Sequence, residues 1–211
     1  MSSFQQFCIL LLLLNQVVAT SLLFEFDPRD ALGIAGSITA TYENPSSSEA
    51  QIVVNLDFQR ANEHAIRMAA GHCPHQINAY EWHLHVKWSA ATSSSSLAQC
   101  SPQATGNHYD PLMACGPSSE FADTQRCRRR VASYACSPRT YADNPLVCEK
   151  GDFSGKFGVL RLDRQRLVQA AWTDPSFPRA EELQPGWSIV LHAICGPKTF
   201  RVACARLQRL P

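Results

Sequence analysis

Short segments in which apolar and polar residues alternate constrain the fold of this chain most strongly. They are rich in β-branched and aromatic residues, and turn-rich stretches such as ENPSSS, TDPSFP and QPGW separate them. The segments span residues 33–42, 50–58, 80–88, 156–163, 166–172, 187–194 and 199–207. A helix is weakly indicated at residues 57–68, and no internal repeat is evident. Many short strands joined by turns and long loops predict an all-β antiparallel sandwich or barrel.

The size and charge of the chain narrow the possible classes of protein. Its 211 residues suit one domain, and 45% of them are hydrophobic, which is enough to fill a core. The formal net charge is only +1, so bulk electrostatics give no reason to expect a nucleic-acid partner. The sequence gives no indication of an oligomeric state.

The first residues have the features of a secretory signal peptide. An apolar stretch is followed by the small-residue region VVA, although Lys and Arg are absent before it. The alternative is a short membrane anchor, but Asn15 and Gln16 interrupt the apolar run. No second apolar run follows, and the C-terminal RLQRLP is too polar for a lipid-anchor signal. We therefore expect a signal peptide at residues 1–19, one secreted domain at residues 20–211, and no transmembrane span.

The cysteine count agrees with secretion. Nine cysteines are present, and Cys8 lies in the expected signal peptide. An even and dense set remains, which favours disulfides formed in an oxidising compartment. A zinc–thiolate site is the alternative, but the chain has no C-x-x-C pair. The remaining cysteines are Cys73, Cys100, Cys115, Cys127, Cys136, Cys148, Cys195 and Cys204.

One long loop, residues 111–151, has little periodicity. A structureless loop of this length needs something to hold it, and its four cysteines could form two local disulfides. It also contains RCRRR, whose run Arg128, Arg129 and Arg130 could bind a polyanion. More commonly, such a run is simply a solvated face.

Four histidines suggest a metal site. His83 and His85 are two apart in YEWHLHVKW, so on a strand both imidazoles point to one face. Two surface histidines would be the ordinary explanation of this pair alone. However, His108 lies in the turn-like GNHYDP, and His192 lies on an apolar strand, where an imidazole needs a polar partner or a metal. Four imidazoles without a nearby thiolate suit copper(II).

Four stretches resemble, in order, motifs of the copper/zinc superoxide dismutase family. The family's H-x-H copper strand is similar to EWHLHVKW, and the segment that supplies its metal-bridging histidine is similar to GNHYDP. The strand with the last copper histidine resembles GWSIVLHA, and the terminal strand resembles FRVACARL. The resemblance extends over residues 33–207. It implies a Greek-key β-barrel of about eight antiparallel strands with a long disulfide-stapled loop.

The resemblance also implies roles for particular residues. Arg201 would guide the superoxide anion, although an ordinary strand arginine is the alternative. Cys204 would pair with Cys100, one of many possible pairings of eight cysteines. Apart from the resemblance, Cys73 could pair with Cys195, since both lie outside the long loop, and this would leave the four loop cysteines to each other; the sequence leaves these pairings open. The copper ligands would be His83, His85, His108 and His192.

The zinc half of the family's pattern is missing. No further histidine occurs between His108 and His192, and Glu149 stands where a zinc histidine belongs. The stretch CEKGDFSGK instead resembles the copper-only branch of the family, which is found on secreted and cell-surface proteins. We therefore expect one copper ion and no zinc. Asp152 would accept a hydrogen bond from the far nitrogen of His108, with Glu149 nearby. Alternatively, both carboxylates solvate a turn.

Other positions also depart from the family. Only eight residues separate His192 from Arg201, so the family's long electrostatic loop is missing and the copper would be open to solvent. Trp187 replaces an arginine, and packing over the barrel end is the simplest explanation. His72 and His75, in GHCPH, could form an extra metal site, but histidines in loops are usually just exposed.

Two functional hypotheses follow. The first is a secreted copper-only superoxide dismutase that converts superoxide to oxygen and hydrogen peroxide, with Arg201 and His108 as catalytic residues. The second is a non-enzymatic extracellular protein on the same fold that binds copper or a matrix component. The complete set of histidines favours the first, because a bare scaffold has no physical need for four convergent imidazoles.

Overall fold

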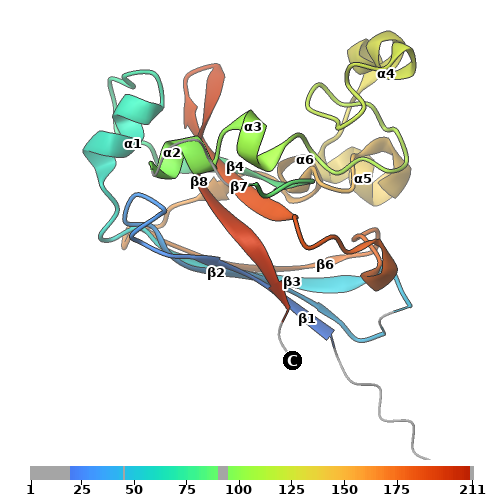
Figure 1. Cartoon of the computed structure of the whole chain (residues 1–211), viewed down its shortest axis with the longest axis horizontal. Helices are drawn as coiled ribbons and strands as arrows, with labels where there is room; N and C mark the ends of the chain where they lie inside the picture. Colours follow the sequence, from blue (N-terminus) through green and yellow to red (C-terminus); the bar gives the residue numbers. More distant parts are fainter. Residues whose placement is uncertain (1–19, 45, 90–94, 210–211) are drawn as a thin grey trace, which may run out of the picture.

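The described part of the chain folds as a nearly closed antiparallel β-barrel (Figure 1). The computed structural model describes residues 20–44, 46–89 and 95–209, so the expected signal peptide at residues 1–19 lies outside it. Crossovers from β3 to β4, from β5 to β6 and from β6 to β7 give the strand order β5-β4-β7-β8-β1-β2-β3-β6, a Greek-key arrangement. The strands are β1 (Thr20–Phe26), β2 (Ala35–Tyr42), β3 (Ala50–Asp57), β4 (Ala79–His85), β5 (Leu160–Arg161), β6 (Leu167–Asp174), β7 (Ser188–Cys195) and β8 (Lys198–Arg209).

The all-β prediction is confirmed, but two segments differ from expectation. Strand β1 was not expected, because its residues directly follow the apolar N-terminal stretch and look like part of it. Its alternating Leu22, Phe24 and Phe26 are nonetheless buried. The strand expected at residues 156–163 is wrong at its start. There the side chain of Asp152 caps helix α6 by accepting a hydrogen bond from the Gly155 N–H, and only β5 pairs with β4.

The inward side chains of the strands form one core, which includes Trp82 on β4. The ring of Trp82 lies 4.9 Å from Phe153 of α6 and 5.4 Å from Trp172 of β6, measured between ring centroids. Its indole N–H donates to the Gly158 carbonyl oxygen. This aromatic cluster packs α6 against β4, so the residues just before α6 lie beside the strand that carries His83.

Short helices and turns gather on the β4–β7–β8 side of the barrel (Figure 1). They cover the outer face of these strands, whereas the sheet formed by β1, β2, β3 and β6 lies on the other side. No helix in the described residues is long and apolar enough to cross a membrane. The elements are α1 (Glu63–Ala69), α2 (Ser96–Gln99), α3 (Pro102–Thr105), α4 (Gln125–Arg130), η1 (Val131–Ser133), α5 (Pro138–Asp143), η2 (Pro145–Val147), α6 (Phe153–Phe157) and η3 (Ala180–Glu182).

Four disulfides connect all eight cysteines outside the expected signal peptide. The pair implied by the resemblance, Cys100–Cys204, is present, Cys73 is bonded to Cys195, and the loop cysteines pair locally. The loop at residues 111–151 is therefore stapled twice, although it also contains the short helices α4 and α5. The arginines of RCRRR lie exposed on α4. The pairs are Cys73–Cys195, Cys100–Cys204, Cys115–Cys127 and Cys136–Cys148.

A fully buried ion pair ties α6 to the end of β6. The Lys156 ammonium group donates to Asp174 at 2.8 Å and to the Lys150 carbonyl oxygen at 2.8 Å. Tyr141 of α5 donates to the other carboxylate oxygen of Asp174. Burial lowers the pKa of Lys156, but these acceptors compensate the charge.

Replacing Asp174 should destabilise the protein strongly. In Asp174→Ala, the Lys156 charge stays buried without its counter-ion, so we expect the free energy of unfolding to fall by about 3–5 kcal/mol. Urea denaturation monitored by tryptophan fluorescence measures this change. Glu181→Ala is the control, since it breaks an exposed ion pair with Arg179 and should change stability by less than about 1 kcal/mol. Equal effects in the two variants would contradict the prediction.

Candidate metal centre

Strand β4 places two imidazoles on its outer face. Trp82 and Leu84 point into the core, so the intervening His83 and His85 point outward, as the two-residue period requires. The covering loops bury both, and their exposed fractions are 5% and 0%. The structure therefore confirms the expected orientation of the pair and excludes two solvent-exposed surface histidines.

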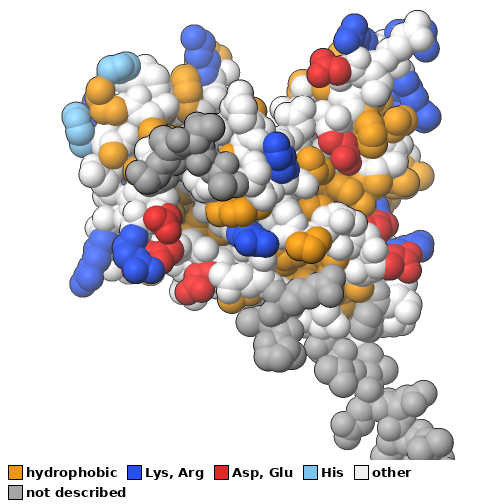
Figure 2. Space-filling model, viewed as in Figure 1, with side chains coloured by type: hydrophobic (Ala, Val, Ile, Leu, Met, Phe, Trp, Pro, Cys, Tyr) orange, Lys and Arg blue, Asp and Glu red, His pale blue; other side chains and the backbone are white. Residues whose placement is uncertain are grey.

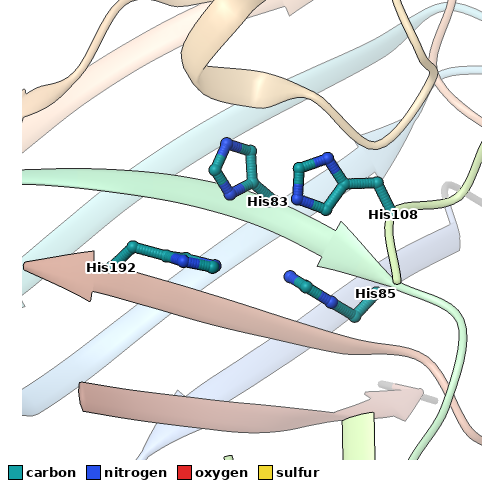
Figure 3. Close-up of side chains that lie close together, drawn as sticks. All are labelled: His83, His85, His108 and His192. Carbon is teal, nitrogen blue, oxygen red and sulfur yellow. The ribbon is translucent and has the colours of Figure 1, made fainter. Parts of the chain in front are cut away.

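The neighbouring strand β7 contributes His192 (Figure 3). The ladder between β7 and β8 shifts at Leu191 and His192, because β8 has one extra residue, Val202, at this point. Such a bulge changes the direction of nearby side chains. Here it pairs His192 directly with Arg201 across the two strands.

The fourth imidazole, His108, comes from the loop after α3. Its backbone N–H donates to the Ser118 carbonyl oxygen at 2.8 Å, and its own carbonyl oxygen accepts from the Glu120 N–H at 3.0 Å. The buried carboxylate of Asp110 braces the loop that follows, accepting from the N–H groups of Ala114 and Cys115 and from the Ser119 hydroxyl. The ring of His108 therefore has a well-defined position beside β4.

The four imidazoles converge on a single point (Figure 3). One ring nitrogen from each lies within 4.8 Å of the others, and His108 and His192 are 6% and 9% exposed. Three buried nitrogens of these rings have no hydrogen-bond partner among the described residues, namely Nδ1 of His83 and Nε2 of His85 and His192. Since buried polar atoms are nearly always partnered, these nitrogens fit a metal ion. An all-imidazole donor set suits copper(II).

Burial also keeps these imidazoles neutral, which metal binding requires. Desolvation lowers the pKa of all four histidines, and it lowers that of His108 to about 4. The positive charge that each protonated neighbour would carry lowers the pKa of His85 and His192 further. Protons therefore compete weakly for the lone pairs at neutral pH.

Hydrogen bonds fix the tautomers of two histidines. Nδ1 of His85 lies 2.9 Å from the Gly106 carbonyl oxygen, to which it donates, so Nε2 keeps its lone pair. Nδ1 of His108 lies 2.7 Å from Oε2 of Glu149, which leaves Nε2 of His108 to face the other rings. Each partner therefore directs the free nitrogen of its ring toward the cluster.

The prediction of the hydrogen-bond acceptor of His108 was wrong. Asp152 was expected to accept its hydrogen bond, but Glu149 does so, because its longer side chain reaches Nδ1. Asp152 instead faces His83, with 3.5 Å between Oδ1 and Nε2. Since Oδ1 also caps α6, this carboxylate is held on the His83 side. Both carboxylates thus lie against the histidine cluster rather than solvating a turn.

The pKa values of the two carboxyl groups are shifted in opposite directions. Burial raises the pKa of Glu149 to about 9, and the negative charge of Asp152 raises it further. Burial would also raise the pKa of Asp152, but hydrogen bonding and charge at His83 outweigh this and hold it well below its usual range.

Arg201 lies at the edge of the cluster and is partly exposed. Its guanidinium donates to the carbonyl oxygens of Cys100 and Gly106 and to the hydroxyl of Thr105. The disulfide from Cys100 to Cys204 holds these acceptors against β8. Burial lowers the pKa of Arg201 to about 10, so it stays charged at neutral pH. All its hydrogen-bond partners among the described residues are uncharged, so its positive charge is not neutralised there.

A cavity of about 440 Å³ opens beside the histidines and the two carboxylates. Tyr134, from the stapled loop, lines it and was not singled out from the sequence. Its hydroxyl donates to Oδ2 of Asp152 at 2.7 Å and accepts from the Glu149 N–H at 3.2 Å. Burial raises the pKa of Tyr134, so the hydroxyl keeps the proton that it donates. No sequence signal marks this residue, because it lies in an aperiodic loop.

The remaining expectations concern the periphery of the site. Trp187 is buried, and its ring centroid lies 4.6 Å from that of Tyr109, the neighbour of His108, so packing explains it. His72 and His75 are both exposed. His75 lies near Cys73, but the sulfur of Cys73 is already bonded in a disulfide, which argues against a second metal site there.

Removing Glu149 should weaken copper binding. In Glu149→Ala, Nδ1 of His108 loses its acceptor and the ring its fixed tautomer, so we expect Cu(II) affinity to fall by about 10–100-fold. A competition titration with a chelator of known affinity measures this. Glu63→Ala serves as the control, because it removes a partly buried carboxylate paired with Arg166 near α1. Unchanged affinity in Glu149→Ala would contradict the assignment.

Comparison with known proteins supports the fold alone. No protein-family model matches the sequence, and no curated protein sequence matches it significantly. Among solved structures, the Cu(II) form of Candida albicans superoxide dismutase 5 is 20% identical, with a TM-score of 0.53 over 92% of this chain and 94% of that one. A glutamate-to-glutamine variant of the same enzyme has a TM-score of 0.54 at the same identity and coverage. The clock protein EA4 is 15% identical, with a TM-score of 0.50 over 90% of this chain and 94% of that one. The chain therefore has the fold of the superoxide dismutases.

Proposed function

We propose that this chain is a secreted superoxide dismutase that uses one copper ion and no zinc. The observation that carries the proposal is the convergence of four buried imidazoles, three of which have an unpartnered nitrogen. A charged and partly exposed guanidinium beside them suits an anionic substrate. The copper ligands would be Nδ1 of His83 and Nε2 of His85, His108 and His192.

The chemistry divides between the ion and the protein. Bound copper would supply one-electron transfer, by which one superoxide is oxidised to oxygen and a second is reduced, with two protons, to hydrogen peroxide. The side chain of Arg201 draws the anion toward the histidines, and its fixed hydrogen bonds keep it in place. His108 would hold one proton at Nδ1 against Glu149, so only Nε2, when it is not bound to copper, could take up a further proton and pass it on during turnover.

The donor set supports copper without zinc. The Nδ1 of His108, which would have to bind a second metal ion, is engaged by Glu149. The other group that faces the cluster here is Asp152, which points toward His83. One imidazole nitrogen and two carboxylates that already bind imidazoles make a poor tetrahedral zinc site.

Secretion is supported by the covalent structure. Four disulfides form readily in an oxidising compartment and are rare in the cytosol. The apolar N-terminal stretch, residues 1–19, would direct the chain there as a signal peptide.

A second candidate is a protein that binds copper without dismutase activity. The fold is also that of the clock protein EA4, and a shared fold does not fix function. Pulse radiolysis of the purified copper-loaded protein separates the two candidates. Catalytic decay of superoxide without added zinc supports the enzyme. Decay at the buffer rate, with copper shown to be bound, supports the second candidate.

Arg201 should affect the rate of superoxide decay but not the copper content of the protein. In Arg201→Ala, loss of the positive charge should slow superoxide decay by about tenfold or more, because electrostatic attraction of the anion is lost. Copper content, measured by atomic absorption, should stay at one per chain. The rate of the natural protein should fall as ionic strength rises, whereas the variant should respond less. A variant as fast as the natural protein would refute this role.

The carboxylate of Asp152, near His83, should affect both copper binding and the rate of superoxide decay. In Asp152→Ala, Nε2 of His83 loses the carboxylate that faces it at 3.5 Å, so we expect weaker copper binding and slower superoxide decay per chain. Pulse radiolysis and a chelator competition on the same samples measure the two effects. The exposed Asp163→Ala, in the turn before β6, is a control that should leave both unchanged. Full activity and affinity in Asp152→Ala would rule out the orienting role.

A further inference from the structure

Tyr134 connects the two residues that face the candidate copper ligands. Its single phenol oxygen donates to the side chain of Asp152 and accepts from the backbone N–H of Glu149. Asp152 faces Nε2 of His83, and Glu149 accepts from Nδ1 of His108. One hydroxyl thus bonds directly to the carboxylate of Asp152 and to the backbone of Glu149, whose side chain orients His108.

The loop around Tyr134 is covalently tied to the same segment. The disulfide between Cys136 and Cys148 begins two residues after Tyr134 and ends one residue before Glu149. Phenol and carboxylate are therefore held close by a short covalent path as well as by hydrogen bonds. This tether limits how far the phenol can move from the carboxylates.

Two glycines make the close approach possible. A Cβ at Gly155 would lie 2.3 Å from the sulfur of Cys136 and 2.4 Å from Oδ2 of Asp152. A Cβ at Gly116 would lie 2.4 Å from Oε1 of Glu149 and 2.9 Å from the ring of Tyr134. All four distances are below ordinary contact distances, so any larger residue would push the loop away. The fit between loop and carboxylates is therefore specific.

We propose that Tyr134 is a positioning residue for the metal centre, and that the disulfide-stapled loop serves to hold it there. The proposal rests on the copper site of the proposed function. The phenol fixes the rotation of the Asp152 carboxylate, and thereby the proton on Nε2 of His83 and the free lone pair on Nδ1. Through the Glu149 backbone it also fixes the carboxylate that orients His108.

Removal of the hydroxyl has a defined physical consequence. Asp152 is largely buried, with 13% of its side chain exposed, so Oδ2 would lose its only described side-chain donor. The carboxylate would turn toward other donors and release His83. Both tautomers of His83 would then be populated, and only one of them presents Nδ1 to the metal.

The test compares Tyr134→Phe with Tyr141→Phe. Tyr141 also donates to a buried carboxylate, that of Asp174, so the control removes the same chemical group from a similar environment. The first readout is the ¹⁵N chemical shifts of the imidazole nitrogens in the metal-free protein, which report the tautomers. The second is the Cu(II) electron paramagnetic resonance spectrum, and the third is copper affinity by chelator competition.

We expect Tyr134→Phe to mix the tautomers of His83, change the Cu(II) spectrum and weaken copper binding about tenfold. Tyr141→Phe should leave all three readouts unchanged. A double variant, Cys136→Ser with Cys148→Ser, should reproduce the effect of Tyr134→Phe, because it frees the loop. It provides a second test if Tyr134→Phe does not fold.

The proposal is overturned if Tyr134→Phe keeps the natural tautomers and spectrum, or if Tyr141→Phe changes them equally. It is also overturned if the double cysteine variant is folded and unchanged. Failure of the proposed function gives a different pattern. Tautomers that depend on Tyr134 in a protein without dismutase activity would support the positioning role while refuting the enzyme. The metal-free measurement decides the positioning role even if the natural protein binds no copper.

Discussion

The candidate centre is governed by the requirement that buried ring nitrogens have partners. Four imidazoles lie within one cluster, and each is less than one tenth exposed. Hydrogen bonds satisfy one nitrogen of His85 and one of His108, and Asp152 faces one of His83. Three other nitrogens of the cluster have no such partner among the described residues, namely Nδ1 of His83 and Nε2 of His85 and His192. A bound cation would supply it, and its binding would then add to the stability of the fold.

The carboxylate segment, residues 149–156, is held from several directions. The Ser154 hydroxyl binds the backbone of Trp82 on β4, and the Lys150 ammonium binds Glu182 in η3. Lys156 forms a buried ion pair with Asp174 at the end of β6. The segment therefore cannot shift relative to β4 without breaking buried polar contacts, each of which is costly to leave unmade. This rigidity explains how the two carboxylates can hold their orientation toward the two imidazoles.

The stapled loop, residues 111–151, also lines the cavity beside the histidines. Its short helices lack the hydrophobic face that would hold longer elements, and its two internal disulfides supply the constraint instead. Figure 2 shows exposed basic side chains at the upper edge of the molecule, where Figure 1 places α4. The buried part of the loop, by contrast, faces the cavity through Tyr134.

Much of this protein could be predicted from local patterns. The two-residue period of a strand places His83 and His85 together wherever the strand lies, and the spacing of Cys136 and Cys148 allows a local disulfide. Prediction failed where the pattern was ambiguous. The strand β1 follows an apolar stretch without a break. The strand expected at residues 156–163 overlaps the end of α6, a helix that begins directly after the capping Asp152.

The sequence by itself determined the all-β class, the outward histidine pair and the cysteines available for pairing, because these depend on backbone periods and residue chemistry. Only the tertiary structure decided which carboxylate meets which imidazole. Glu149 and Asp152 are three residues apart, and nothing local distinguishes their targets. The cap on α6 turns Asp152 toward His83, and the longer side chain of Glu149 reaches His108. Tyr134 could be found only in the same way, because its contacts join segments that the disulfide and the fold bring together.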